Sequence, residues 1–284
     1  MKHRINSFGL LIALSLSCLA AFSQTWSDYY VIGATVLQPR EGAPLFIGKV
    51  SPGSPSGLAG MKAGDRLLTV NGTPVTTARE AARFLRSDTP GQVQLRLWRK
   101  GQEYEVRVGR EKFSEILFRA GQRIVGAGVI VPTDTTQAEI DRMVQFEPNR
   151  IVARVFPQHV PLNPDRFACG FELFVLREPE EVMVGGIDDG PASKAGLHWG
   201  DVILSVNGVN PRGKTATELE VLFTGSRPQE VRLVVNRLGT VKTIVFQLEK
   251  VADLLKRNQV RLIESTLVPA ELAEEDIRWF LQRD

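Results

Sequence analysis

Few side chains in this sequence could carry out covalent or metal chemistry. The 284 residues contain three histidines and two cysteines, and His3 and Cys18 fall within the first 23 residues. The others are His159 in a proline-rich loop, His198 in a glycine-rich motif and Cys169 ahead of an apolar run. A serine hydrolase needs a histidine between a nucleophile and an acid, and a zinc site needs several closely spaced ligands. With no G-x-S-x-G motif and no such ligand spacing, the sequence predicts no catalytic centre, no metal site and no cofactor.

The strongest pattern is a motif that occurs twice, 136 residues apart. Residues 55–72 read PSGLAGMKAGDRLLTVNG, and residues 191–208 read PASKAGLHWGDVILSVNG. Among the matching positions are Pro55/Pro191, Ala59/Ala195, Gly60/Gly196, Gly64/Gly200, Asp65/Asp201, Asn71/Asn207 and Gly72/Gly208. The chain therefore contains an internal duplication. Because Asp65 and Asp201 hold the same place in separate copies, we interpret them as turn-stabilising residues and not as an acid pair.

Each position of the motif has a local structural reason. Proline suits the first turn of a short helix, where its missing N–H costs nothing. The glycine after the alanine suits the left-handed conformation that ends such a helix. Apolar alternation then predicts a strand, and Asn-Gly predicts a tight turn after it. The motif therefore predicts a helix, a turn, a strand and a second turn. None of these elements needs a catalytic residue.

The duplicated motif resembles the centre of a bacterial PDZ domain, of the kind found in HtrA-type periplasmic proteases. The resemblance covers about residues 30–112 and 166–250. It implies an α+β fold with two PDZ domains, each a small, partly open β-barrel or sandwich with two helices. The expected order is a signal peptide at 1–23, PDZ domains at 29–112 and 166–250, a spacer with a helix and a strand at 113–165, and a helical tail at 251–284.

The resemblance also implies a peptide-binding groove in each domain. A glycine-containing loop would offer backbone N–H groups to an anion such as a terminal carboxylate, and a bound peptide would add a strand between this loop's strand and the longer helix. The implied groove residues of the first domain are Val31, Ile32, Gly33, Ala34, Ala78, Ala82 and Leu85. Those of the second are Ala168, Cys169, Gly170, Phe171, Ala216, Glu220 and Phe223. Each loop has one glycine where the full motif has two. We therefore expect these grooves to bind an extended strand in general, with only a weak preference for a terminal carboxylate.

The longer helices are marked by capping boxes. Thr77 with Glu80, and Thr215 with Glu218, can each satisfy backbone N–H groups at a helix start. Neither helix begins with the histidine that related domains use to select Ser or Thr in the peptide. We therefore expect an apolar preference in the first groove, whereas Glu220 favours polar or basic side chains in the second. Cys169 is interpreted as a small buried apolar residue and not as a reactive thiol.

Two segments fall outside the resemblance. Residues 113–165 show no repeat partner in the sequence; Thr136 and Glu139 form a third capping box that predicts a helix to about residue 145, and residues 150–156 predict a strand. This segment is interpreted as a rigid spacer, with a partner-binding patch as the alternative. Residues 269–283 predict a helix, with acids early and arginines late. It would either pack on the second domain or dock another protein.

The N-terminus is typical of an exported protein. Positive residues precede an apolar stretch at 9–22, and small residues stand before Gln24, which indicates a signal peptide cleaved near Ser23. The alternatives are an uncleaved membrane anchor and a lipid attached at Cys18. In either alternative the protein would be held at the membrane; otherwise it would be periplasmic or secreted.

Composition is that of a soluble protein, with 43% hydrophobic and 24% charged residues. A net charge of +3 without a basic cluster gives no sign of nucleic-acid binding. The sequence shows no serine-protease motif of the kind that accompanies these domains in related enzymes. We expect a non-catalytic adaptor that binds extended or C-terminal segments of envelope proteins. The alternatives are an accessory subunit of a separate HtrA-type protease and a structural tandem whose grooves are filled by its own tail or middle segment.

Overall fold

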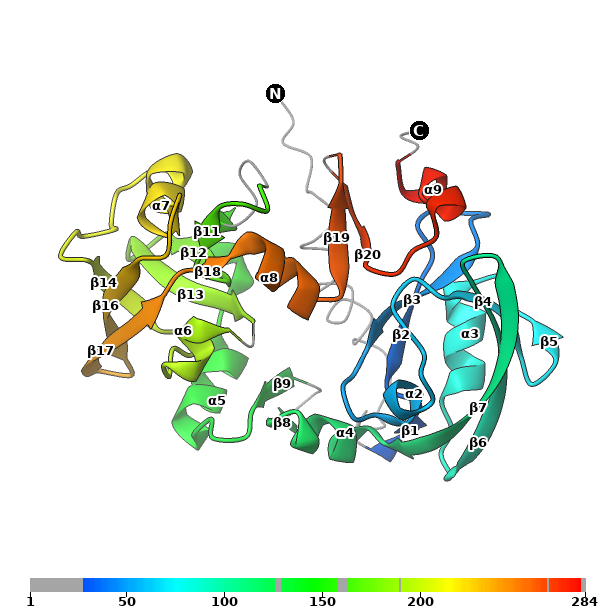
Figure 1. The fold of residues 1–284 in the computed structure, drawn as a ribbon. Helices are drawn as coiled ribbons and strands as arrows, with labels where there is room; N and C mark the ends of the chain where they lie inside the picture. The colour runs from blue at the N-terminus through cyan, green and yellow to red at the C-terminus, as the bar shows by residue number, and fades with distance from the viewer. Residues whose placement is uncertain (1–27, 126–128, 158–162, 189, 265, 282–284) are drawn as a thin grey trace. The chain divides into compact units, whose positions relative to one another are not determined.

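The computed structural model describes residues 28–125, 129–157, 163–188, 190–264 and 266–281 (Figure 1). The predicted signal peptide and Cys18 lie outside these residues. The chain forms two compact units, one of residues 1–135 and 258–284 and the other of residues 136–257. No helix in the described ranges is long and apolar enough to cross a bilayer.

The first unit is built on an open antiparallel sheet in the order β1-β7-β6-β4-β3-β2, with β5 paired to β4. Its strands are β1 (Tyr30–Val31), β2 (Ala34–Leu37), β3 (Leu45–Val50), β4 (Arg66–Val70), β5 (Thr73–Pro74), β6 (Gly91–Arg99) and β7 (Gln102–Lys112). Helices α2 (Pro55–Leu58) and α3 (Ala78–Leu85) stand where the motif and the capping box predict them. Alternate residues of β6 and β7 enter a core that includes Leu95 and Leu97.

The second unit repeats this plan. Its main sheet runs β10-β12-β13-β14-β16-β17, and a smaller sheet runs β15-β11-β18. The strands are β10 (Ile151–Val155), β11 (Phe167–Ala168), β12 (Phe171–Leu176), β13 (Glu181–Ile187), β14 (Val202–Val206), β15 (Thr224–Gly225), β16 (Glu230–Arg237), β17 (Thr240–Gln247) and β18 (Glu249–Lys250). Helices α6 (Pro191–Lys194) and α7 (Ala216–Leu222) match α2 and α3. The α+β prediction is confirmed, and neither main sheet closes into a barrel within the described residues.

The duplication extends beyond the PDZ-like portions, so the expectation that residues 113–165 have no repeat partner is wrong for residues 113–132. After the last strand, α4 (Phe113–Arg119) and the hairpin β8 (Gln122–Val125) and β9 (Val129–Pro132) recur as α8 (Val251–Arg257), β19 (Val260–Ile263) and β20 (Thr266–Pro269). The hairpins even repeat one contact. Arg123 donates a hydrogen bond to the carbonyl of Thr135, and Arg261 donates one to the carbonyl of Leu272, both at 2.7 Å.

The tail differs from its prediction. In place of one helix over residues 269–283, β20 is followed by a 3-10 turn, η4 (Glu274–Asp276), and the short helix α9 (Arg278–Leu281). From residue 258 onward the tail belongs to the first unit, whereas α8 belongs to the second. Its apolar residues surround Phe46, which is fully buried, and the main chain at Leu272 fits directly against Gly64, where a Cβ would lie 2.3 Å from the Leu272 nitrogen. The apolar periodicity of residues 269–283 predicts a helix, but periodicity cannot reveal a close contact between two main-chain segments.

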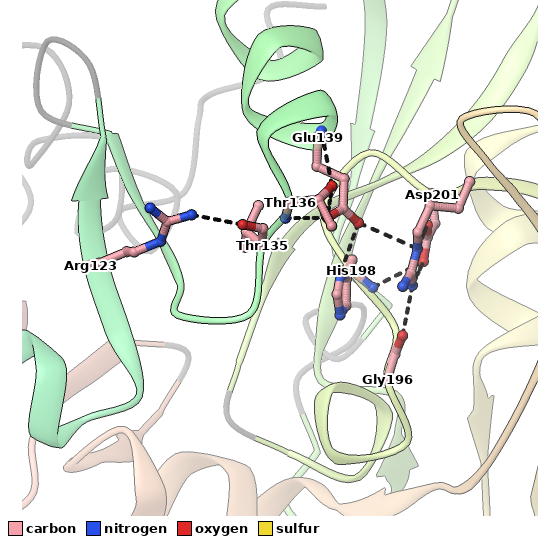
Figure 2. A network of polar contacts seen from close by, with 8 residues as sticks. Arg123, Thr135, Thr136, Glu139, Gly196, His198 and Asp201 are labelled. Atoms are coloured by element: carbon pink, nitrogen blue, oxygen red, sulfur yellow. Dashed lines mark hydrogen bonds and ion pairs between the residues drawn. The ribbon is translucent and has the colours of Figure 1, made fainter.

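The middle segment, residues 113–165, is divided between the two units. Helix α5 (Gln137–Gln145) begins at the predicted Thr136 capping box, and it belongs to the second unit together with η2 (Pro148–Arg150) and β10. The Glu139 carboxylate lies 3.0 Å from Nδ1 of His198 (Figure 2). It also lies 3.6 Å from the Arg237 guanidinium. The second unit therefore contains residues from 136 onward that follow the first sheet in the sequence, and the first unit contains residues from 258 onward that follow the second sheet.

Candidate peptide-binding grooves

The loop before β2 is held by its carbonyl groups. Gly33 accepts a hydrogen bond from the Ser51 N–H at 2.8 Å, and Ile32 accepts one from the Ser56 N–H at 2.9 Å. Gly33 has φ +78°, and a Cβ there would lie 2.3 Å from the Cβ of Ser54. The position therefore requires glycine for both its backbone angle and its close neighbour.

The first groove has an open sheet edge. Strand β2 is the last strand of its sheet, paired on one side with β3, and no strand in the described part of the chain covers its other side. Its residues stay partly accessible to solvent, and α3 lies beside it. Of the predicted helix residues, Ala82 is exposed, Ala78 is half-buried and Leu85 belongs mainly to the core. An unpaired strand beside a helix is the geometry that accepts an added strand.

The second groove has the same parts. Gly170 has φ +74° and accepts a hydrogen bond from the Asp188 N–H at 3.2 Å, as Gly33 does from Ser51. Among the predicted residues, Ala168, Cys169, Phe171 and Phe223 are buried, Glu220 is half-buried and Ala216 is exposed. Burial raises the pKa of Glu220 above its usual value, and it raises the pKa of the Cys169 thiol to about 12. The thiol donates to the Phe171 carbonyl, in line with the predicted structural role.

The edge of the second groove is already paired. Strand β12 bonds β13 on one side and β10 on the other, both antiparallel, and β10 lies against α7. The strand at residues 150–156 was predicted, but its pairing partner was not, because β-propensity carries no information about which edge a strand joins. The two domains therefore share the same strands and helices, but the sheet edge is open in the first groove and paired with β10 in the second.

The two aspartates that the repeated motifs share have the expected structural role. Asp65 accepts a hydrogen bond from the Lys62 N–H at 2.7 Å, and Asp201 accepts one from the His198 N–H at 2.9 Å. Each carboxylate also pairs with an arginine, Arg99 in the first unit and Arg237 in the second. Among the described residues, no group of histidine, cysteine, aspartate and glutamate side chains could hold a metal ion.

Both domains therefore place an antiparallel sheet beside a helix in the same arrangement. The family model described as "PDZ domain" matches residues 46–99 and 183–237, and the chain carries two PDZ domains. Peptide or protein binding is the general function that these domains imply.

Curated relatives match over part of their length. The chain is 27% identical over 229 residues to the magnetosome formation protease MamE of Paramagnetospirillum magneticum, covering 72% of this chain and 30% of that protein. It is 30% identical over 105 residues to the carboxy-terminal processing protease CtpA of Bacillus subtilis, covering 35% of this chain and 22% of that protein. The chain thus spans less than a third of either relative.

Among solved structures, a photosystem II D1 C-terminal processing protease aligns with a TM-score of 0.30 at 23% identity. The alignment covers 35% of this chain and 27% of that one.

Proposed function

We propose that this protein is a non-catalytic adaptor that binds extended segments of other proteins through its first PDZ groove. The observation that carries the proposal is the open edge of β2 beside α3. An incoming strand would gain main-chain hydrogen bonds from β2, and its alternate side chains would face α3. The small residues Ala78 and Ala82 leave room for apolar side chains there.

Export to the cell envelope is part of the proposal. The charged and apolar N-terminal pattern supports it, and the partners would be envelope proteins that offer extended or C-terminal segments. The absence of a serine-protease motif from this sequence supports a binding role over catalysis. Membrane attachment would follow only if the N-terminal segment is retained or lipidated at Cys18.

A second candidate is an accessory subunit that presents substrates to a separate protease. The observation in its favour is that the relatives MamE and CtpA are themselves named proteases. Co-purification from an envelope extract separates the two candidates. A stoichiometric protease in the purified complex supports the accessory, and its absence alongside other captured envelope proteins supports the adaptor.

The groove itself is tested with a C-terminal and an internal peptide library against the full chain. Ala82→Phe fills the exposed face of α3, and we expect it to weaken selected peptides at least about tenfold, since 1.4 kcal/mol corresponds to a factor of ten. Arg83→Phe, one position along the same helix, is the matched control and should bind as the wild type does. Peptides that bind both variants equally, or that leave hydrogen exchange of residues 34–37 unchanged, would refute binding in this groove.

A further inference from the structure

The chain's own strand occupies the place of a ligand in the second groove. β10 pairs antiparallel with β12 and lies against α7, the two elements that form the groove. The register places Val155 opposite Leu173 and Arg154 opposite Phe174. Strand addition to an exposed edge, with a helix alongside, is the way such modules hold a partner's segment.

Side chains of β10 occupy the groove on both faces. Val155 is 1% exposed and belongs to the same buried cluster as Phe171, Leu219 and Phe223. Arg154 points the other way, with its guanidinium 5.1 Å from the centre of the Phe174 ring. The strand therefore has an apolar anchor in the core and a cation on the outer face.

Glu172 on β12 faces this cation. Its side chain is largely buried, and its Oε1 atom accepts no hydrogen bond in the described structure. The Arg154 guanidinium lies 3.8 Å from that oxygen. A buried carboxylate without a nearby cation is costly, so a basic residue next to the apolar anchor is favourable at this position. Thr35 holds the equivalent position in the first domain, where no such charge is present.

The framework does not require the extra strand. In the first domain, the strand equivalent to β12 is β2, which keeps its outer edge uncovered within the described residues. β2 and its neighbour β3 are paired in the register that β12 and β13 repeat 137 residues later, including an irregularity at the same place. β10 is thus an addition to a sheet that forms in its absence elsewhere in the chain.

β10 reaches the groove as part of a docked segment. Helix α5 precedes it by way of η2 and is held to the domain by the contact of Glu139 with His198. This anchoring keeps the strand near its groove. A short tether gives an effective concentration of order millimolar, so a free peptide of equal intrinsic affinity must reach about that concentration to compete.

We propose that residues 150–156 are a resident ligand of the second PDZ groove, and that this groove takes an external segment only when they are displaced. The external ligand is an internal extended protein segment with a branched apolar residue preceded by a basic one. A free C-terminal carboxylate is not needed, because the resident strand continues along the chain to Pro157. The inference concerns the second groove and stands apart from what the first groove binds.

The test is complementation in trans with the full-length protein. In one variant, residues 150–156 are replaced by an equally long Gly-Ser segment. The probe is a labelled synthetic peptide of residues 149–157, and binding is followed by fluorescence anisotropy together with hydrogen exchange of residues 171–176. We expect the variant to bind the peptide at least about a hundredfold more tightly than the wild type, with exchange protection restored at residues 171–176.

Two further reagents make the readout specific. A peptide with Arg154→Glu and Val155→Asp should not bind the Gly-Ser variant at the second groove. A full-length protein with cysteines at Ala153 and Val175, which are direct partners in the ladder, should lose residual peptide binding there when oxidised and regain it when reduced.

Three outcomes would overturn the proposal. Equal peptide affinity for the wild type and the Gly-Ser variant would show that the segment does not close the groove. Peptide binding without protection of residues 171–176 would place the peptide elsewhere. A second unit that is unfolded in the Gly-Ser variant and is not restored by saturating peptide would show that β10 is an integral strand of the domain and not a ligand.

Discussion

Glu139 lies with its carboxylate 3.0 Å from Nδ1 of His198, and this contact joins a helix that follows the first PDZ domain to the motif of the second. The same carboxylate also accepts hydrogen bonds from the backbone N–H and the hydroxyl of Thr136, both at 2.8 Å. One side chain therefore starts α5 and docks it. The stability of this docking should depend on the charge of Glu139.

Glu139→Gln should lower the free energy of unfolding of the second unit by about 1.5–3 kcal/mol, the range for hydrogen bonds to a charged group. The measurement is denaturant unfolding combined with hydrogen exchange of residues 137–145. Asp141→Asn, at an exposed position of the same helix, is the control and should change stability by less than about 0.5 kcal/mol. Unaltered exchange over α5 in Glu139→Gln would contradict the role given to this carboxylate.

The same docking should be sensitive to acid. Burial raises the pKa of Glu139, but the hydrogen bonds from Thr136 and His198 outweigh it and leave the pKa below the usual 4.5. A carboxyl group with a lowered folded-state pKa stabilises the fold above its unfolded-state pKa, and this contribution is lost as the pH falls through the lower value. The protection of α5, taken as the intrinsic exchange rate at each pH divided by the measured rate, should therefore fall as the pH is lowered from about 5 to 3. In Glu139→Gln this part of the pH dependence should disappear.

Asp201→Asn and Asp65→Asn should each destabilise mainly their own unit. Both carboxylates are buried and pair with an arginine, and removing one member of a buried pair costs up to about 3–5 kcal/mol. The effect should be smaller for Asp65, because the Arg99 side chain is 26% exposed whereas that of Arg237 is 11% exposed. Unit-resolved hydrogen exchange checks both. Equal effects on the two units from either variant would contradict the assignment, and Asp88→Asn at the surface is the control.

The two groove glycines should differ in tolerance. In Gly33→Ala the new Cβ would meet the Cβ of Ser54 at 2.3 Å, whereas in Gly170→Ala it would meet the flexible end of Leu254 at 2.9 Å. Both also carry the cost of a positive φ, of order 1 kcal/mol. Gly42→Ala, with positive φ and open space around it, isolates that backbone cost. In thermal unfolding, Gly33→Ala should lose the most stability, Gly170→Ala less and Gly42→Ala the least. If Gly42→Ala were the most destabilising of the three, the steric argument would be wrong.

The sequence was sufficient for the parts of the fold that depend on local rules. Asn71 and Asn207 adopt positive φ in the predicted tight turns, and the helix beginning at Thr215 has both hydrogen bonds of a capping box. The capping box predicted at Thr77 and Glu80 forms only in part. The Thr77 hydroxyl accepts a hydrogen bond from the Glu80 N–H as expected, but the Glu80 carboxylate accepts one from the N–H of Thr76 and not from that of Thr77.

The sequence was insufficient where long-range packing decides. The repeat beyond residue 112 keeps few identical residues, such as Val131-Pro132 and Val268-Pro269. What the two hairpins share is an arginine that donates to a main-chain carbonyl, and this contact is visible only in the structure. The partner of β10 and the attachment of the tail at Gly64 depend on contacts between segments far apart in the chain. Periodicity identifies a strand or a helix but does not say where it docks.

Cys169 offers a direct measure of how often the second groove region opens. With Cys18 replaced by serine, it is the one thiol in the sequence. Burial raises the pKa of this thiol to about 12, whereas an ordinary thiol has a pKa of about 8.5, so the native thiol is both shielded and poor in thiolate. Iodoacetamide should therefore modify the native protein at least about tenfold more slowly than the denatured protein. Modification should be faster in Glu139→Gln if α5 and β10 shield this region together, and equal rates for native and denatured protein would show that the thiol is not buried in solution.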